Sequence, residues 1–279
     1  MSERLAGKPV AQDLYRKTRA RSEQYTSVTG FVPKAAVIRV GEKAEDLSYE
    51  KGIRRHAEEA GVVLETHALA EDAGEAEIIA CIHRLNEDRE VTGILLFLPL
   101  PAGIDQQKVV NEISPAKDLD GATDASKLHV YTGQGVGFAP CTPEAVLVLL
   151  DFYGIRLEGA HAVIIGRSMV VGKPLSMLLL KRNATVTVCH SRTRDLKKLT
   201  RGADILISAA GKIGMVTPEM VCEEQTVIDV GINFDDHGKM KGDVLYDDVV
   251  NAVRAVTPVP GGVGAVTTAV LLSHAVPEI

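Results

Sequence analysis

The segment Gly166–Pro174, which reads GRSMVVGKP, is the part of the sequence best suited to bind a phosphate. It follows the apolar run 161–165 and precedes a helical pattern. A glycine at the strand end permits a tight turn, and the helix N-terminus offers N–H groups to a pyrophosphate. Gly166, Ser168 and Gly172 form the pattern G-x-S-x-x-x-G, in which serine replaces the second glycine of the usual dinucleotide fingerprint. An ordinary strand-to-helix turn also favours glycine and serine, and this alternative stays open.

The strand after this turn indicates which nucleotide is bound. NAD sites usually place Asp or Glu at the end of that strand, about 20 residues after the loop begins, to bind the ribose 2′-hydroxyl. Here the segment 186–193 reads VTVCHSRT and contains no acidic residue. Arg167, Ser191 and Arg192 could instead bind a 2′-phosphate through charge-assisted hydrogen bonds, which favours NADP over NAD. A solvated surface cation is the alternative interpretation of Arg192.

Strand-like and helical segments alternate along the chain of 279 residues. Short apolar, β-branched runs occur at 35–40, 62–66, 93–98, 162–165, 185–189, 204–208 and 226–230. Helical patterns lie between most of them, for example at 49–60, 75–86 and 172–181. This alternation predicts an α/β fold with parallel sheets and helices on both faces.

Two segments rich in proline or glycine divide the chain. The sequence PCTP predicts a turn and then a helix, with Thr142 as N-cap, Pro143 at the first helical position and Gly154 as C-terminal cap. The segment Thr257–Gly264, TPVPGGVG, is too rich in proline and glycine for a regular element, and the apolar run 267–275 predicts a short last helix. We therefore expect two lobes with a ligand cleft between them.

The composition excludes several classes of protein. Lys plus Arg number 31 and Asp plus Glu number 37, which gives a net charge of −6, and no dense basic cluster indicates nucleic-acid binding. The apolar runs fall far short of the roughly 20 residues that span a bilayer, and the N-terminus has no secretory signal pattern. The four cysteines form no C-x-x-C pair and the eight histidines show no ligand spacing. We expect reduced thiols, no metal site, no membrane contact and a cytoplasmic protein.

Six motifs, taken together, resemble the bifunctional methylenetetrahydrofolate dehydrogenase/cyclohydrolase family. They read LPLP, KDLDG, PCTP, GRSMVVGKP, CHSRT and TPVPGGVG, and the similarity runs from AGKPVA at residues 6–11 to the last helix. The resemblance implies a homodimer with a folate-binding domain, residues 1–142 with 265–279 packed back on it, and a Rossmann-like NAD(P)-binding domain, residues 143–264. It also implies oxidation of 5,10-methylenetetrahydrofolate to the methenyl form, followed by hydrolysis to 10-formyltetrahydrofolate.

The resemblance also implies roles for individual residues. Tyr49 matches the active-site tyrosine that lines the folate, and Asp120, in KDLDG, matches the carboxylate that holds the pterin. A carboxylate suits this role because it can accept hydrogen bonds from two adjacent N–H donors of a pterin edge. A plain Asp–Gly turn is the alternative. The remaining matches are the loop beside folate and cofactor, Pro260, Gly261 and Gly262, and a cofactor-binding position, Ile232.

The sequence departs from the family at two positions that are physically coupled. The family's catalytic lysine lies four residues after the tyrosine, on the same helix face, and here this position is Ile53. The family's glutamine, which orients that lysine, is replaced by Phe97. Losing both polar groups together avoids an unsatisfied buried partner. As residue types, Ile53 and Phe97 also fit an ordinary core.

The two departures affect the two reactions differently. Hydride transfer depends mainly on positioning, whereas hydrolysis of the methenyl group needs general acid–base groups, which typically contribute about 10²–10⁴-fold. We therefore expect an NADP-dependent dehydrogenase with weak or absent cyclohydrolase activity. The alternatives are a fully bifunctional enzyme, a non-catalytic nucleotide- or folate-binding relative, and a dehydrogenase for another small substrate.

Two smaller departures accompany them. Asp46 stands where the family usually has a serine, and we interpret it as a cap of the helix that carries Tyr49. Ala265 and Val266 replace the usual Pro-Met after GGVG.

Overall fold

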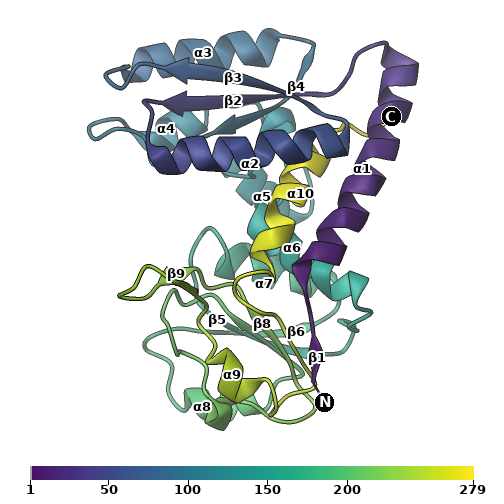
Figure 1. Cartoon of the computed structure of the whole chain (residues 1–279), viewed down its shortest axis with the longest axis vertical. Coiled ribbons are helices and arrows are strands. Elements are labelled where there is room, and N and C mark those ends of the chain that lie inside the picture. Colours follow the sequence, from purple (N-terminus) through teal and green to yellow (C-terminus); the bar gives the residue numbers. More distant parts are fainter. Residues whose placement is uncertain (1) are drawn as a thin grey trace. The chain divides into compact units, whose positions relative to one another are not determined.

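Two separate parallel sheets organise residues 2–279, which the computed structural model describes (Figure 1). Unit 1 comprises the chain up to Ala11 and the segment Thr142–Thr267, and unit 2 comprises Gln12–Cys141 and Thr268–Ile279. The observed α/β fold with parallel strands confirms the predicted fold class.

Unit 1 contains a six-stranded parallel sheet in the order β1-β11-β8-β7-β5-β6. The strands are β1 (Glu3–Arg4), β5 (His161–Ile165), β6 (Thr185–Cys189), β7 (Ile205–Ser208), β8 (Thr226–Asp229) and β11 (Ala255–Val256). The chain places β6 on one side of β5 and β7 on the other. In open α/β sheets, ligands bind beyond the carboxyl ends of the strands at such a reversal of strand order.

Helices and a short hairpin complete unit 1. They are α6 (Cys141–Phe152), α7 (Gly172–Lys181), α8 (Leu196–Arg201), α9 (Tyr246–Val249), the 3₁₀ turn Pro218–Met220, and the antiparallel pair β9 (Asn233–Phe234) and β10 (Met240–Lys241). As predicted, Gly154 ends α6 in the left-handed conformation, with φ 64°. The predicted N-cap Thr142 is wrong, because α6 already begins at Cys141.

Unit 2 contains a three-stranded parallel sheet in the order β3-β2-β4. Its elements are α1 (Gly7–Thr29, which begins in unit 1), β2 (Lys34–Val40), α2 (Ala44–Ala60), β3 (Val63–Leu69), α3 (Glu75–Glu87), β4 (Val91–Leu96), α4 (Gln106–Val110), the 3₁₀ turn Pro115–Lys117, α5 (Asp124–Thr132) and α10 (Gly264–His274, which ends in this unit). Right-handed crossovers from β2 to β3 and back past β2 to β4 place α2 and α3 on opposite faces, as Figure 1 shows. Ile38, Ile78, Ile82 and Ile94 form the core between the sheet and α3.

The structure differs from the sequence-based expectation at the N-terminus. Residues 2–11 were expected in the folate-binding domain, but β1 pairs with β11 and so belongs to unit 1. Gly7 continues this contact, since its N–H donates to Gly261 and a Cβ there would overlap the carbonyl oxygen of Gly262. The role of Asp46 is also corrected: α2 begins at Ala44, so Asp46 lies in its first turn and Lys43 is the N-cap.

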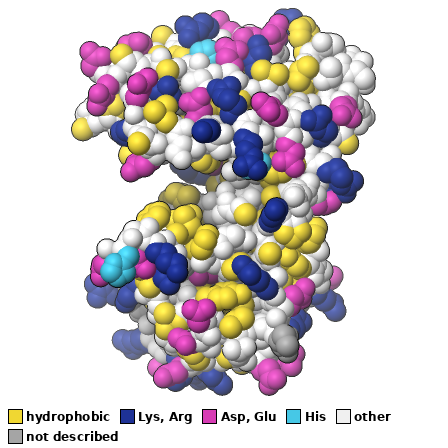
Figure 2. Space-filling view, in the orientation of Figure 1, with side chains coloured by type: hydrophobic (Ala, Val, Ile, Leu, Met, Phe, Trp, Pro, Cys, Tyr) yellow, Lys and Arg dark blue, Asp and Glu magenta, His cyan; other side chains and the backbone are white. Residues whose placement is uncertain are grey.

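Within residues 2–279, the helices are all too short or too polar to cross a membrane. On the face shown in Figure 2, basic and acidic side chains are interspersed over both units.

The hydroxyl of Thr92 ties together three segments of unit 2, and its removal tests this role. Its oxygen accepts from Lys34 N–H (3.0 Å) and lies 2.6 Å from the carbonyl oxygen of Ala275, beyond α10, to which the hydroxyl donates. Thr92→Val keeps the shape and leaves both buried groups without this partner, so the free energy of unfolding should fall by about 1–3 kcal/mol in urea titrations.

The matched control is Thr132→Val, whose exposed hydroxyl donates to the backbone oxygens of Leu128 and Gln134 and accepts from the Gln134 N–H, all within four residues along the chain. It should change the free energy of unfolding by at most about 0.5 kcal/mol. Equal effects of the two substitutions would contradict the assigned role.

Candidate active site

The turn between β5 and α7 folds so tightly that two of its positions admit only glycine. Gly166 has φ 134°, and a Cβ on it would overlap the carbonyl oxygen of Ala209. A Cβ on Gly172 would overlap the carbonyl oxygen of Gly166. Ser168 Oγ accepts from the Val171 N–H (3.1 Å) and braces the turn from within. The result is a bare backbone turn before the ten-residue helix α7, which suits close approach of a pyrophosphate.

The turn after β6 lies beside the turn after β5, because the two strands are paired over their whole length. Its shape is fixed from within: His190 N–H donates to Thr193 Oγ1 (2.8 Å), and Arg192 N–H donates to His190 Nδ1 (3.1 Å). Ser191 and Arg192 are exposed on this turn, and Arg167 is exposed on its neighbour. The three residues predicted to bind a 2′-phosphate therefore lie on adjacent turns at one edge of the sheet.

A third group of predicted residues lines one pocket of 280 Å³ at the ends of β8 and β11. Ile232 follows β8 and leaves 61% of its surface exposed. Pro260, Gly261 and Gly262 follow β11 and line the same pocket as Ile232. The structure thus brings these four residues together within unit 1.

Two buried carboxylates behind these turns were missed by the sequence analysis. Asp229, at the end of β8, accepts from the N–H groups of Gly231, Asp243 and Val244 at 2.9–3.0 Å. Burial raises the pKa of Asp229 to about 6, although these hydrogen bonds act in the opposite direction. Asp243 is the second carboxylate and is completely buried. The signal in the sequence was an acid at the end of an apolar strand, VIDVG, and an acid after glycine, KGDV.

Tyr49 packs against Phe97 in unit 2. Their ring centroids are 5.4 Å apart with the planes tilted by 34°. Tyr49 lies on α2 with 46% of its surface exposed, whereas Ile53, one helical turn later, is fully buried. Ile53 is therefore a core residue in this chain, and the Phe97 ring supports the ring of Tyr49.

Asp120 lies on a turn that a neighbouring carboxylate holds in place. The buried carboxylate of Asp118 accepts from Ala122 N–H (3.0 Å), Thr123 N–H (2.8 Å) and the Ser126 hydroxyl (2.7 Å). Gly121 has φ 62°, and a Cβ there would lie 2.7 Å from the backbone of residues 138–140. The Asp–Gly turn foreseen as an alternative is present, and Asp120 is an exposed residue on it, although protein atoms surround its carboxyl group.

The surroundings of Asp120 oppose its ionisation. Burial raises its pKa to about 6; a hydrogen bond from the Cys141 thiol lowers it, the charge of Asp118 raises it, and His274 lowers it. His274, at the end of α10, donates from Nδ1 to the carbonyl oxygen of Leu119 (2.8 Å), which fixes the ring beside the turn. This makes Asp120 a carboxyl group that titrates near neutrality.

The neighbours of Tyr49 keep its hydroxyl protonated. Burial raises the pKa of Tyr49, and the charges of Asp120, Cys141 and Tyr15 raise it further. All three neighbours are acids, so the phenol has no cationic partner among them. A neutral phenol beside a carboxylate can hold a polar ring but cannot act as a base at neutral pH.

The fold and these turns define a dinucleotide-dependent enzyme of the α/β class, and comparison with known proteins identifies its family. Residues 140–279 match the tetrahydrofolate dehydrogenase/cyclohydrolase NAD(P)-binding domain, and residues 5–120 match the catalytic domain of the same family. The chain belongs to the tetrahydrofolate dehydrogenase/cyclohydrolase family.

Individual relatives are similar over nearly their whole length. A protein of Clostridium kluyveri named bifunctional protein FolD is 45% identical over 98% of this chain and 95% of its own length. The crystal structure of the bifunctional FolD methylenetetrahydrofolate dehydrogenase/cyclohydrolase from Campylobacter jejuni has a TM-score of 0.94 and 39% identity, covering 99% and 98% of the two chains. The Trypanosoma brucei enzyme, complexed with NADP and an inhibitor, has a TM-score of 0.89 and 30% identity, covering 98% and 96%.

The raised pKa of Asp120 gives a test with a defined sign. The folded chain holds the Asp120 proton more tightly than the unfolded chain, in which this aspartate has a pKa of 3.8. Ionisation of Asp120 therefore lowers the free energy of unfolding as the pH rises from about 4 to 6. Asp120→Asn cannot ionise. Its melting temperature should exceed that of the wild type by about 2 °C or more at pH 7.5, and this gain should vanish near pH 4.

Asp124→Asn is the matched control, because hydrogen bonds from Asn111 and Lys127 lower the pKa of Asp124. It should lower the melting temperature at pH 7.5. A gain for Asp120→Asn that did not depend on pH would show that ionisation of Asp120 is not the cause.

Proposed function

We propose that this chain oxidises 5,10-methylenetetrahydrofolate with NADP and has little or no methenyltetrahydrofolate cyclohydrolase activity. The observation that carries the proposal is the packing of Tyr49 on Phe97 beside the fully buried Ile53. Tyr49 and Asp120 can still hold a folate, whereas Ile53 and Phe97 are apolar and cannot activate water. The relatives above are named bifunctional, so the proposal separates this chain from them in one of their two activities.

The residues of unit 1 fit a dinucleotide. The bare turn Gly166–Gly172 accommodates a pyrophosphate against the start of α7, with Ser168 bracing it. Arg167, Ser191 and Arg192 supply two cations and a hydroxyl for a 2′-phosphate. When bound, NADP accepts the hydride that leaves the methylene carbon, which yields the methenyl cation and NADPH.

The residues of unit 2 bind and orient the folate. In its ionised form Asp120 accepts hydrogen bonds from adjacent N–H groups of the pterin. Tyr49 offers a protonated hydroxyl and a ring face held by Phe97. Removal of a hydride needs no proton transfer from the protein, so positioning by these groups suffices.

Hydrolysis of the methenyl cation makes a different demand. A water molecule must lose a proton as it attacks, and the ring nitrogen that leaves must gain one. Ile53 and Phe97 can do neither. Asp120, whose pKa is about 6, is the candidate base for any residual hydrolysis, and such a rate would rise with pH through that value.

Restoring the two polar groups tests the assignment of the lost activity. Wild-type protein, assayed with methylenetetrahydrofolate and NADP, should form 10-formyltetrahydrofolate at no more than about 1% of the rate of NADPH formation, after correction for spontaneous hydrolysis. Ile53→Lys combined with Phe97→Gln should raise formyl production by about 10²-fold or more. Formyl production that keeps pace with NADPH formation in the wild type would refute the proposal.

The control is Ile53→Met combined with Phe97→Leu, which alters the same two positions and keeps them apolar. It should leave formyl production at the wild-type level, and melting curves should show both double variants folded. A gain in this control would mean that looser packing, not the new lysine, activates water.

The choice of NADP is tested at the turn after β6. Arg192→Gln should raise the KM for NADP about tenfold or more and leave the KM for NAD within about twofold, because only NADP carries the 2′-phosphate. Arg194→Gln, an exposed arginine two residues later, is the control and should change neither. A wild-type enzyme that reduces NAD as efficiently as NADP would contradict this assignment.

A further inference from the structure

The carboxylate of Asp243 is the centre around which the turn after β7 folds. It receives five hydrogen bonds, from Ala210 N–H (2.7 Å), Gly211 N–H (3.3 Å), Lys212 N–H (2.8 Å), the Ser208 hydroxyl (2.9 Å) and the Asn233 amide (3.1 Å). Asp243 is completely buried, whereas residues 210–212 are exposed. Three successive backbone N–H groups of a surface turn are therefore directed inward, to one carboxylate.

This arrangement fixes which groups the turn can offer to a ligand. In a trans peptide the carbonyl points opposite to the N–H of the same unit. With the N–H groups of 210–212 turned to Asp243, the carbonyls of Ala209, Ala210 and Gly211 point away from it. The turn thus presents hydrogen-bond acceptors, which suit the hydroxyl and carboxamide donors of a dinucleotide, whereas the N–H groups before α7 suit its phosphates.

The turn is also in direct contact with the phosphate turn. β7 is paired with β5, and Ala209 N–H donates to the carbonyl oxygen of Ile165 (2.8 Å). The Ala209 carbonyl lies so close to Gly166 that no side chain fits between them. A shift of the turn 209–212 would therefore displace the Gly166 turn as well.

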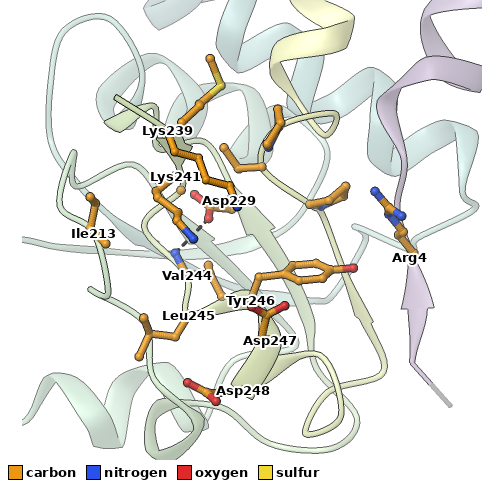
Figure 3. Close-up of a pocket in the computed structure, with 15 residues that line it drawn as sticks. Arg4, Ile213, Asp229, Lys239, Lys241, Val244, Leu245, Tyr246, Asp247 and Asp248 are labelled. Carbon is orange, nitrogen blue, oxygen red and sulfur yellow. Dashed lines mark hydrogen bonds between the residues drawn. The ribbon is translucent and has the colours of Figure 1, made fainter. Parts of the chain in front are cut away.

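Asp243 is itself held in place by the second buried carboxylate. Asp229 accepts from Asp243 N–H (3.0 Å) and from Val244 N–H (2.9 Å), the bond drawn in Figure 3. The two glycines at this junction have no room for a side chain: a Cβ on Gly242 would overlap the Asp229 carboxylate, and one on Gly231 would overlap that of Asp243. Both carboxylates contact the backbone of this junction directly, and this close packing restrains its movement.

We propose that Asp243 is a positioning residue for the dinucleotide: it turns the carbonyls of Ala210 and Gly211 outward as acceptors and fixes the turn against which the phosphate turn packs. Asp243 touches neither cofactor nor substrate in this role. The inference rests on the proposed use of a dinucleotide by unit 1 and extends it to a residue outside the fingerprint.

Calorimetric titration of the full chain with NADP tests the proposal, with NAD titrated in parallel. Asp243→Asn keeps the size of the side chain but replaces one accepting oxygen by a donor, which faces N–H groups it cannot satisfy. The dissociation constant for NADP should rise about tenfold or more at a stoichiometry near one. The dissociation constant for the folate substrate, which depends on unit 2, should stay within about twofold. An unchanged NADP dissociation constant in folded Asp243→Asn would overturn the proposal.

Asp204→Asn is the matched control. Asp204 directly precedes β7, at the amino ends of the strands of the same sheet, where its carboxylate accepts from His161 N–H (2.7 Å). This substitution should leave NADP binding within about twofold. If it weakens binding as much as Asp243→Asn, the effect comes from general loosening of the sheet and the proposal fails.

Hydrogen exchange in the wild type provides a test that does not depend on a variant. The amides of 210–212 should exchange slowly without cofactor, and added NADP should change their protection little, because they are bonded to Asp243. Rapid exchange, or strong new protection by NADP, would overturn the proposal. Wild-type protein that binds NAD but not NADP would refute the proposed cofactor alone, and the Asp243 comparison would then be read from the NAD titrations.

Discussion

A buried carboxylate that accepts backbone N–H groups is the interaction on which both candidate sites depend. Asp118 accepts hydrogen bonds from the turn that presents Asp120 in unit 2, and Asp243 accepts hydrogen bonds from the turn beside the phosphate-binding turn in unit 1. An ionised carboxylate is costly to bury unless several donors compensate it. The donors to Asp118 and Asp243 include consecutive main-chain N–H groups, so satisfying each carboxylate also fixes the backbone of its turn.

The apolar pair Ile53 and Phe97 changes the electrostatics of the groups that remain. A lysine near Asp120 would favour the carboxylate and lower its pKa. In this chain the neighbours of Tyr49 are acids, and burial keeps the pKa of Asp120 near 6. Asp120 raises the pKa of the Tyr49 phenol, and burial raises the pKa of Asp120 itself; under the proposed function, this environment suits binding of a pterin edge better than proton transfer between water and substrate.

The sequence predicted what is encoded locally and missed what depends on contacts between distant segments. The strands β2 to β8 and helix α7 follow from apolar β-branched runs and glycine punctuation, and they begin and end within a few residues of the predicted bounds, whereas β1 and β11 match no predicted run. Strand β1 has two residues, too few to show a period, and only its pairing with β11 places it. The role of Asp243 was invisible for the same reason: the groups it binds lie 10 to 35 residues away along the chain. The ring contact between Phe97 and Tyr49 was likewise not predicted, because the two residues lie far apart along the chain.

The two family activities differ in how widely their requirements are spread over the chain. Binding a dinucleotide and a folate depends on turns built from many backbone groups, and these survive in a chain that is 45% identical to a protein named bifunctional. Under the proposed function, proton transfer to and from water depends instead on single side chains at two positions. Overall sequence identity therefore reports well on the turns that bind ligands and hardly at all on two individual side chains. Under the proposed function, divergence that preserves the fold removes hydrolysis through two side chains, and Ile53 is a position where this is easy, because it faces the core and an apolar side chain there stabilises the helix that carries it.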